Sequence, residues 1–403
     1  MKYGIGDLIR IVHYNMPPEL RRYYKFMDVF IRKIRNYFMP VWHCVFKDMQ
    51  SGGLFTYVHI GWDSKLRHYW INRFSDNFQI VFENRKSISW NINGFLEKNK
   101  DKIDLCIIES SKNAPSGRYP HSFLLPRWME MELDFESFLK KSAIKKIGRS
   151  IKMHSLRFEV REDIESFDLF YHTMYKPTVL KRHGKSSQLA PYKGFSDKLI
   201  NKKGTLFFLI KENEPVAAVF IEIKNGKYRL SLSGVKDGSG EILKMGAVGA
   251  LRYFIMFYYY EKYIDTLMIG VSMPVIFDGV TEFKMHLGAR PYLKDLESRS
   301  KFYFIPNNSE PLTSKMLKLN PLLYISGSEL NAALFVNDED YETKKEFFKF
   351  FNRSRIDNVE MTKVFYFDKS EKIAQWINEE EIDNIEFIKY EKWNRATDQK
   401  SPL

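Results

Sequence analysis

The sequence of 403 residues contains little cysteine and no pair of residues at metal-ligand spacing. Its two cysteines, Cys44 and Cys106, cannot form a disulfide framework, and neither an H-x-x-x-H nor a C-x-x-C pattern occurs among the nine histidines and two cysteines. We therefore predict no metal site, and the low cysteine content favours a reducing, cytoplasmic compartment.

Long apolar segments are also missing. The N-terminus lacks the apolar core and the cleavage site of a signal peptide. The most apolar run, 245–260, is interrupted by Arg252, is rich in tyrosine and is too short to cross a bilayer. This run is typical of a buried helix in a soluble protein.

Aromatic residues and positive charge are plentiful. Phenylalanine, tyrosine and tryptophan make up 16% of the chain, and the formal net charge is +13. Such an excess favours anionic partners: a phosphate-bearing cofactor, a nucleotide-linked substrate, RNA, or an acidic membrane face. The excess does not choose between them, and the oligomeric state is not indicated.

Two segments concentrate the basic residues. The first, 19–38, reads as an amphipathic helix that either docks on the body with a solvated basic face or contacts a membrane surface or RNA. The second follows Glu136 and has no acid before Glu159. With 3.6 residues per turn, Lys141, Lys145 and Arg149 share a helix face, and Lys152 follows close by. This face is either solvated or binds an anion.

Residues 204–288 have the clearest order of elements. Strands are predicted at 204–210, 216–223 and 228–233, and Asn225-Gly226 makes a hairpin turn between the last two because both residues tolerate positive φ. A helix is predicted at about 241–263, then a strand at 265–269 and a short helix at 280–287 that ends at Gly288.

This order resembles the acyl-transfer half of the GNAT superfamily, and more closely its FemAB-like branch, whose members move acyl or aminoacyl groups onto amines. The residues that carry the resemblance are Glu214-Pro-Val-Ala-Ala218, Ser233-Gly234, Lys244-Met-Gly-Ala-Val-Gly249, Asp265 with Gly270, and Asp278-Gly-Val-Thr-Glu-Phe-Lys284-Met-His-Leu-Gly-Ala289. The Phe-Lys pair followed by a glycine is the most specific.

The resemblance implies an α/β (α+β) fold with tandem GNAT-like halves, a mixed central sheet and a small C-terminal α/β appendage. We predict the following divisions: a basic helical segment at 1–38, a degenerate GNAT-like half at 39–125, the acyltransferase domain at 126–305, the appendage at 306–392 and a flexible tail at 393–403. For the appendage, the pattern after residue 331 predicts β-α-β-α-β with some parallel pairing.

The start of the 241–263 helix is the candidate phosphate cradle, because helix N-termini offer unpaired N–H groups and a positive dipole end. Lys244, Gly246 and Gly249 are therefore candidate cofactor-binding residues, together with Ser233 and Gly234 at the end of the preceding strand. The alternative is that the glycines allow the helix to pack tightly. We expect Gly246 to serve the cradle and Gly249 the packing.

Other site residues come from the resemblance. It implies that Lys284 lies near the transferred carbonyl or a substrate phosphate, with Phe283 beside it, and that a backbone N–H within 230–234 polarises the carbonyl. Arg182 matches an arginine that contacts a phosphate or the acceptor, and the face with Lys145, Arg149 and Lys152 becomes substrate-binding. Asp278 is the first candidate for a general base; His286 and Glu222 are alternatives.

The predicted function is transfer of an acyl group from acyl-CoA, first of all acetyl-CoA, to an amine of a sugar-, nucleotide- or peptide-linked precursor in cell-envelope or polysaccharide biosynthesis. One alternative keeps the fold and uses an aminoacyl-tRNA donor. The other is a noncatalytic protein of the same scaffold that binds RNA or an anionic membrane.

Overall fold

The computed structural model describes residues 39–390 apart from 76, 90, 112–113, 116–117, 120–121, 184–188, 297–298, 307–310 and 368–369. The predicted helix at 19–38 and the tail at 393–403 lie outside these residues. The chain divides into two compact units: unit 1 lies within Met1–Leu124, Lys301–Leu317 and Tyr390–Leu403, and unit 2 within Leu125–Ser300 and Lys318–Lys389.

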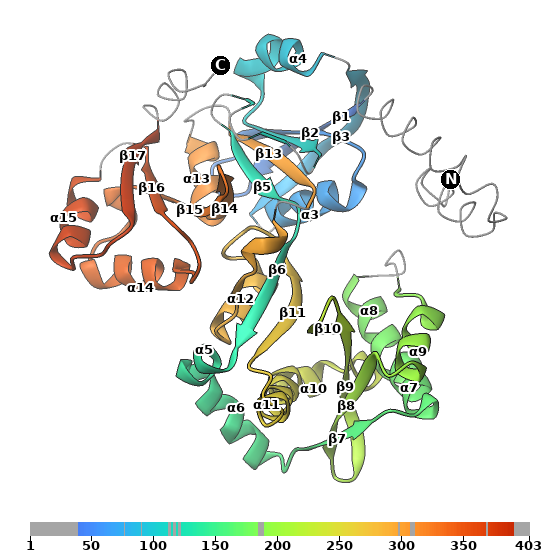
Figure 1. Ribbon diagram of the computed structural model, residues 1–403. Helices are drawn as coiled ribbons and strands as arrows, with labels where there is room; N and C mark the ends of the chain where they lie inside the picture. Colours follow the sequence, from blue (N-terminus) through green and yellow to red (C-terminus); the bar gives the residue numbers. More distant parts are fainter. Residues whose placement is uncertain are drawn as a thin grey trace. The chain divides into compact units, whose positions relative to one another are not determined.

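Unit 2 is built on a seven-stranded sheet (Figure 1). All neighbouring strands are antiparallel except β10 and β11, which run parallel. The apolar and aromatic stretches predicted as strands within 204–269 all form strands of this sheet. In spatial order its strands are β12 (Arg290–Pro291), β6 (Met129–Asp134), β11 (Thr266–Ser272), β10 (Lys227–Val235), β9 (Glu214–Lys224), β8 (Gly204–Lys211) and β7 (Arg157–Arg161).

The helices of this sheet occur in the order expected for a GNAT-like half. Among the described residues, four helical segments connect β7 to β8, two α-helices and the 3-10 turn η3 (Lys236–Gly238) connect β10 to β11, and one α-helix follows β11. The predicted fold class is confirmed by this order together with the parallel β10–β11 pair. The segments are α7 (Ile164–Leu169), the π-helical turn η2 (Phe170–Tyr175), α8 (Lys176–His183), α9 (Tyr192–Ile200), α10 (Gly240–Lys244), α11 (Ala247–Tyr260) and α12 (Gly279–His286).

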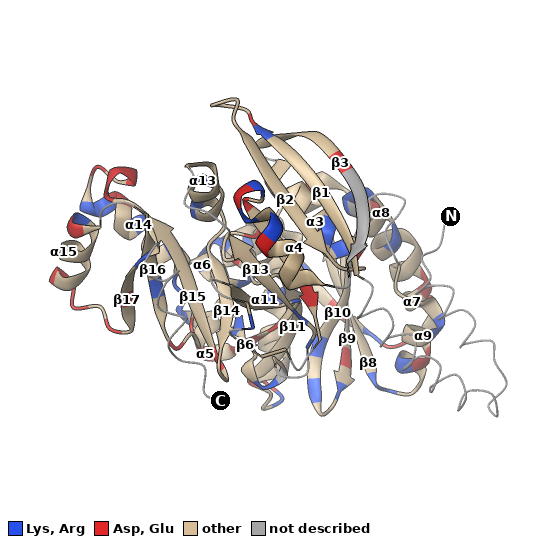
Figure 2. Cartoon of the chain, turned by 90° about the horizontal axis from the view of Figure 1, so that it is seen from above, with Lys and Arg blue, Asp and Glu red and all other residues tan. Residues whose placement is uncertain are grey.

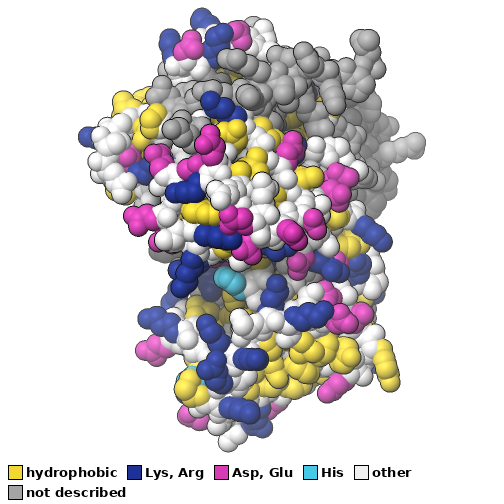
Figure 3. All heavy atoms as spheres, turned by 90° about the vertical axis from the view of Figure 1, so that its left-hand side faces the viewer, with side chains coloured by type: hydrophobic (Ala, Val, Ile, Leu, Met, Phe, Trp, Pro, Cys, Tyr) yellow, Lys and Arg dark blue, Asp and Glu magenta, His cyan; other side chains and the backbone are white. Residues whose placement is uncertain are grey.

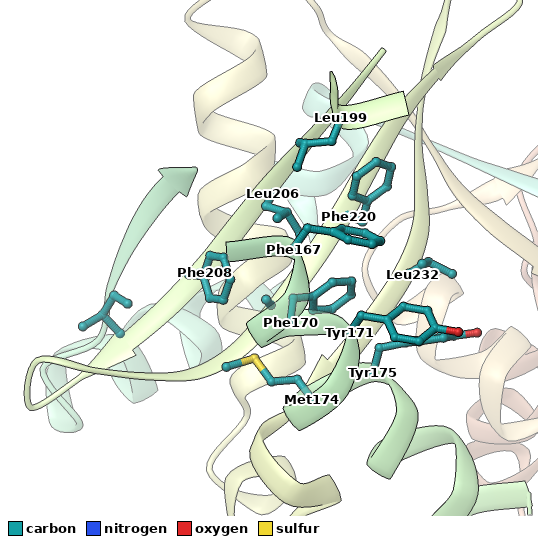
Figure 4. Packing of buried hydrophobic residues seen from close by; sticks show 12 residues of the cluster. Phe167, Phe170, Tyr171, Met174, Tyr175, Leu199, Leu206, Phe208, Phe220 and Leu232 are labelled. Atoms are coloured by element: carbon teal, nitrogen blue, oxygen red, sulfur yellow. The ribbon is translucent and has the colours of Figure 1, made fainter. Parts of the chain in front are cut away.

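One face of the sheet is covered by α7, η2 and α9. Figure 4 shows Phe167, Phe170 and Met174 from this layer packed against Phe208 and Phe220 of the strands. The close approach reaches the backbone at Gly234, where an added Cβ would lie 2.4 Å from the carbonyl carbon of Met174. Burial of this cluster therefore fixes η2 directly on the end of β10.

The helix predicted at 241–263 is interrupted. Gly246 has φ 86°, in the left-handed region, and separates α10 from α11. The basic helix is interrupted as well: Lys141 is extended and lies between α5 (Phe135–Lys140) and α6 (Ser142–Met153). Lys141 consequently does not share the α6 face with Lys145 and Arg149, as its sequence spacing predicted.

Unit 1 is a six-stranded arrangement in the order β3-β1-β2-β4-β13-β5. Here β2 and β4 are parallel, and β13 pairs antiparallel with β4 although it follows the whole seven-stranded sheet in the sequence. Residues 301–305, which we predicted as the end of the acyltransferase domain, therefore belong to unit 1. Its elements are β1 (Met39–Asp48), β2 (Leu54–Ile60), α3 (Ser64–Ser75), β3 (Phe78–Ser89), α4 (Ile92–Asn99), β4 (Leu105–Ser110), β5 (Phe123–Pro126) and β13 (Lys301–Pro306).

The appendage alternates as predicted, and its last three strands are parallel. The sequence did not reveal the first strand, which pairs antiparallel with the second, or the helix before it. Residues 311–317 of α13 (Pro311–Leu319) belong to unit 1. In unit 2 the appendage consists of β14 (Leu322–Ser326), β15 (Glu329–Val336), α14 (Lys344–Ser354), β16 (Thr362–Tyr366), α15 (Glu371–Glu379) and β17 (Ile385–Lys389).

The contact between η2 and β10 can be tested with Gly234→Ala. The new methyl group would collide with backbone atoms of Met174 and Tyr175, so we expect unfolding to become easier by about 1–3 kcal/mol or more. Gly148→Ala in α6 is the matched control, because nothing lies within 4 Å of its added Cβ and alanine is favoured over glycine in a helix by about 0.8–1 kcal/mol. Urea unfolding of both variants measures the difference, and equal midpoints would contradict the packing described here.

Candidate active site

The divergence of β10 and β11 creates the candidate site. The two parallel strands pair at one register position, Arg229 with Met268, and Figure 1 shows them moving apart beyond it. A register shift between Leu230 and Leu232 bends β10, and one between Met268 and Val271 bends β11. Such divergence leaves space between the two strands for a side chain or a ligand.

Lys284 reaches into this divergence. A Cβ placed on Gly270 of β11 would lie 3.6 Å from the carbonyl oxygen of Leu230 in β10 and 3.8 Å from Lys284 Nζ. Gly270 itself has φ 79°, a conformation that glycine adopts without strain. The ammonium group therefore lies close to both strands at the point where they separate.

The first turn of α12 positions Lys284. Asp278 caps the helix by accepting from the backbone N–H groups of Val280 and Thr281, and the Thr281 hydroxyl donates to the Met273 carbonyl. Lys284 is 4% exposed, and its Nζ donates to the Val271 carbonyl over 2.8 Å. Asp278, predicted as a catalytic residue, is thus engaged in the helix cap.

The electrostatics of Lys284 are unusual for a lysine. Burial, and secondly the positive charge of Arg252, lower its pKa from 10.5 to about 7, while Glu130 and Asp278 oppose this. No carboxylate among the described residues lies within ion-pair distance of its Nζ. The side chain therefore changes charge near neutrality, which is typical of lysines that take part in chemistry.

Arg252 of α11 lies beside Lys284, and no carboxylate in the described ranges forms an ion pair with it. Its Nε and Nη1 atoms are buried and have no hydrogen-bond partner among the described residues. Burial, and secondly Arg182, lower its pKa to about 10, and its guanidinium lies 4.7 Å from the ring centroid of Phe283. A buried guanidinium without acceptors is costly, so this arrangement fits a ligand that brings negative charge.

The nearest buried acid, Glu130 of β6, already has two partners. Its carboxylate accepts from Arg229 over 2.7 Å and from Arg299 over 3.0 Å, and it is 2% exposed. Because Arg229 and Arg299 pair with the Glu130 carboxylate, its negative charge does not compensate Lys284 and Arg252. The strand divergence is therefore positively charged overall.

The alternative base candidates are placed differently. Glu222 of β9 is buried and accepts from Lys198 and, over 2.6 Å, from the Ser231 hydroxyl. Burial alone would raise its pKa, but these hydrogen bonds outweigh burial and lower it. His286 is exposed at the last residue of α12. Neither occupies the position that Lys284 holds between β10 and β11.

Of the residues predicted to form the phosphate cradle, Gly246 and Gly249 pack against α6. The added Cβ of Gly249 would be 3.3 Å from the Ile147 side chain of α6, and that of Gly246 would be 3.4 Å from the Ser150 hydroxyl, which donates to the Met245 carbonyl. Ser233 is exposed on β10, Gly234 packs on η2, and Lys244 is exposed at the end of α10.

Of the predicted substrate-binding residues, two adjoin the site. The Phe283 ring contacts the Arg252 guanidinium, and the positive charge of Arg182, at the end of α8, lowers the pKa of Arg252. Lys145, Arg149 and Lys152 are instead exposed along α6. Sequence reasoning missed Arg252 and Glu130 as site residues, although the signal for Arg252 was present: it is the one charge inside the most apolar run of the chain.

In unit 1, the Glu109 side chain occupies the end of the parallel strand pair. Its parallel pair, β2 and β4, keeps four register positions, and at its end Glu109 accepts from the backbone N–H groups of Trp62 and Asp63 just before α3. His59 also bonds this carboxylate, over 2.9 Å. A Cβ on Gly61 would lie 2.2 Å from the Glu109 carboxyl carbon. An anion at this helix start is thus already supplied internally.

The appendage braces the helix that carries Lys284. Arg353 of α14 donates twice to the carboxylate of Glu282 in α12, and its guanidinium lies 4.5 Å from the Phe277 ring centroid. On the same side, the Ile276 N–H donates to Pro321 and the Leu323 N–H to Pro274. The segment between β11 and the end of α12 is therefore fixed from outside the sheet.

With this geometry in place, the chain can be compared with known proteins. No protein-family model and no curated protein matches the sequence, whereas 35 chains of solved structures match. FemX is 12% identical with a TM-score of 0.34, covering 67% of this chain and 85% of FemX. The C-terminal domain of a putative lysylphosphatidylglycerol synthetase from Agrobacterium fabrum is 13% identical with a TM-score of 0.32, covering 68% and 86%.

A tandem GNAT protein from the clavulanic acid biosynthesis pathway is 9% identical with a TM-score of 0.28, covering 56% of this chain and 75% of that one. These are likenesses of fold alone. The mixed α/β fold class expected from the sequence is confirmed by the element order and the strand order of unit 2.

The lowered pKa of Lys284 predicts how stability depends on pH. In the unfolded chain the amine keeps its proton up to about pH 10.5, whereas in the folded protein it releases the proton near pH 7. The unfolded state binds more protons between these values, so stability rises with pH across this window. Lys284→Met removes the dependence, and we expect the difference in unfolding free energy to reach a few kcal/mol near neutral pH.

Urea unfolding from pH 7 to 10 measures this, with Lys345→Met, at an exposed position of α14, as the control. If the wild type and Lys284→Met show parallel pH profiles, Lys284 is not held in the buried environment described above.

Proposed function

We propose that the chain is an acyltransferase whose reaction, the formation of an amide, takes place in the divergence of β10 and β11. One of its substrates carries negative charge. The observation that carries this proposal is a pair of cations, the buried Lys284 and the half-buried Arg252, where the strands diverge. Lys284 donates to a backbone carbonyl, and two buried nitrogen atoms of Arg252 have no acceptor within the described part of the chain. The class of enzyme is implied by the fold; the residue roles come from the site.

In the proposed reaction, the nitrogen of the acceptor amine attacks the carbonyl carbon of the donor. The C–S bond of a thioester, or the C–O bond of an ester, breaks, and the thiol or hydroxyl leaves with the proton lost by the amine. Negative charge develops on the carbonyl oxygen, and the Lys284 ammonium donates to it. One such donor typically contributes about 2.7–4 kcal/mol to lowering the barrier.

Arg252 binds the negative group of the substrate. Its planar guanidinium can donate two parallel hydrogen bonds to a carboxylate or phosphate. Because its charge also lowers the pKa of Lys284, neutralisation by a bound anion raises that pKa and favours the ammonium form. Substrate binding and activation of Lys284 are therefore coupled.

The donor we propose first is an acyl-CoA, with an amine on a sugar-, nucleotide- or peptide-linked precursor as acceptor. The second candidate is an aminoacyl-tRNA, whose ester needs no pyrophosphate cradle at the start of α11. The packing of Gly249 against Ile147 favours this second candidate. The proposed setting, envelope or polysaccharide biosynthesis in the cytoplasm, follows from the acceptor class.

The role of Lys284 can be tested with Lys284→Met and Lys284→Arg. We expect the methionine variant to lose about 10²–10³ in kcat, whereas arginine, which keeps the charge, retains part of it. Because only the ammonium form donates, the rate of the wild type should fall as pH rises above 7, and this fall should shift to higher pH in Lys284→Arg. Release of free thiol from acyl-CoA, or of deacylated tRNA, measures the rate; wild-type kcat in Lys284→Met would contradict the proposal.

The role of Arg252 can be tested by thermal unfolding with acetyl-CoA, longer acyl-CoAs and aminoacyl-tRNA. A ligand at 100 times its Kd stabilises the folded state by about 2.7 kcal/mol. We expect Arg252→Leu to abolish the shift caused by the true donor or acceptor and to raise the melting temperature without ligand, since a buried unpaired charge is removed.

Arg355→Leu, at an exposed position, is the control and should leave both values unchanged. An Arg252→Leu variant that melts earlier than the wild type and still shifts with the ligand would show that the guanidinium is structural. Absence of any ligand shift in the wild type would favour the noncatalytic alternative.

A further inference from the structure

We propose that α5, α6 and the outer side of α11 form a surface that docks on an anionic lipid bilayer. This surface, called here the basic-aromatic face, belongs entirely to unit 2 and does not depend on the proposed reaction. It combines three features that rarely occur together on a surface exposed only to water: uncompensated positive charge, an aromatic outer helix face and protruding aliphatic side chains.

The positive charge lies on α5 and α6. Five lysines and arginines there are exposed, and within the described residues only Lys140 has an acidic partner, Glu136. The chain has no acid between Glu136 and Glu159, so each further cation adds repulsion along the helix. These cations are Lys140, Lys145, Lys146, Arg149 and Lys152.

Charge is distributed differently on α14 and α15, two other helices of unit 2. Figure 2 shows acidic and basic residues side by side on α14 and α15, and Lys344 of α14 pairs with Glu379 and Glu380. Figure 3 shows basic side chains gathered in the lower half of the face on which α5 and α6 lie in Figure 1, beside a hydrophobic area. α6 differs from these two helices in carrying charge of one sign, and it fits a surface of the opposite sign.

The outer side of α11 is aromatic where a surface helix is normally polar. Its inner side, with Leu251, Ile255 and Tyr259, is buried, and the residues on the other side are partly exposed aromatics. They extend onto neighbouring elements: Tyr260 stacks on Phe135 of α5 at 3.7 Å, and Phe254 packs on Phe158 of β7 at 5.0 Å. The outward aromatics are Tyr253, Phe254, Phe257, Tyr258 and Tyr260.

Aliphatic and aromatic side chains protrude at both ends of this face. Ser150 of α6 donates to Met245, and Phe135 of α5 stacks on Tyr260, so α5 and α6 run antiparallel to α11. Leu139 and Tyr260 therefore protrude at one end, with exposed fractions of 48% and 50%, and Met153 at the other with 73%. Tyr263, just after α11, is 99% exposed.

A bilayer surface explains all three features. Lysine and arginine attract anionic headgroups, tyrosine is favoured at the boundary between headgroups and hydrocarbon, and leucine and methionine enter the hydrocarbon edge. RNA would use the cations but has no use for protruding leucine and methionine side chains. No helix in the described part of the chain is long and apolar enough to cross a membrane, so the contact would be made from one side.

The test is flotation of the full chain with phosphatidylcholine vesicles that contain or lack phosphatidylglycerol, at low and high salt. We expect binding only with phosphatidylglycerol, weakened by salt. Lys145→Glu/Arg149→Glu should weaken it at least about tenfold. The matched control, Lys345→Glu/Lys349→Glu, makes the same change at the same spacing on α14 and should bind as the wild type does. Equal binding of the two double variants, or no binding by the wild type, would overturn the proposal.

Contact at the protruding end is tested with Met153→Cys carrying an environment-sensitive fluorophore, because both native cysteines are buried. Its emission should shift to the blue with phosphatidylglycerol vesicles, whereas a label at Lys349→Cys should not respond. Binding of tRNA that is lost in Lys145→Glu/Arg149→Glu, together with no response of the Met153→Cys label to vesicles, would assign the face to nucleic acid instead.

Discussion

Two cations, the buried Lys284 and the half-buried Arg252, lie where β10 and β11 diverge, and the proposed site depends on them. Parallel strands gain hydrogen bonds by staying together, yet these two pair at one position only. Gly270 permits the bend in β11, and Lys284 fills part of the opening by donating to Val271. Neither this bond nor Glu130, which is held by two arginines, compensates the second cation, Arg252. The unfavourable free energy of this uncompensated charge therefore arises where a bound negative group can offset it.

The two units treat the same topological feature in opposite ways. In unit 1 the parallel strands remain paired, and Glu109 occupies the N–H groups before the following helix. In unit 2 the strands separate, and the side chains left at the opening are cations. A negative charge is thus built into the first unit, whereas in the proposed reaction a ligand brings it to the second. This difference explains why chemistry is expected from one unit although both contain a parallel pair followed by a helix.

The surroundings of the site restrict its movement. Asp278 caps α12 from within the sheet domain, and Arg353 holds Glu282 on the same helix from the appendage. On the other side of the sheet, η2 approaches the backbone of β10 so closely that Gly234 admits no side chain. In the proposed reaction Lys284 donates to a developing negative charge, and such restraint favours this role because pre-organised donors lose little energy in reorienting. The appendage, for which the sequence predicted no chemistry, contributes to the site by restraining α12.

The sequence by itself determined the meander of β8, β9 and β10, the strand β11, the short helix α12 and the alternation of the appendage. Each depends on local signals: β-branched and aromatic runs, the Asn225-Gly226 turn, and Gly288 at the end of the short helix. Lys284, Phe283 and Arg182 were identified through resemblance to a family. The interruptions at Lys141 and Gly246 were missed, because helical spacing on both sides hides one extended or left-handed residue.

Only the tertiary structure decided which charges matter. Arg252 and Glu130 are 122 positions apart and belong to no motif, so their significance depends on burial and on which partners reach them. The candidate cradle glycines were placed against α6 by packing that no local pattern encodes. The return of β13 to unit 1 after nearly two hundred residues is likewise a property of sheet pairing. A local pattern specifies the conformation of a segment, whereas the charge balance of a site depends on segments that meet only in the folded chain.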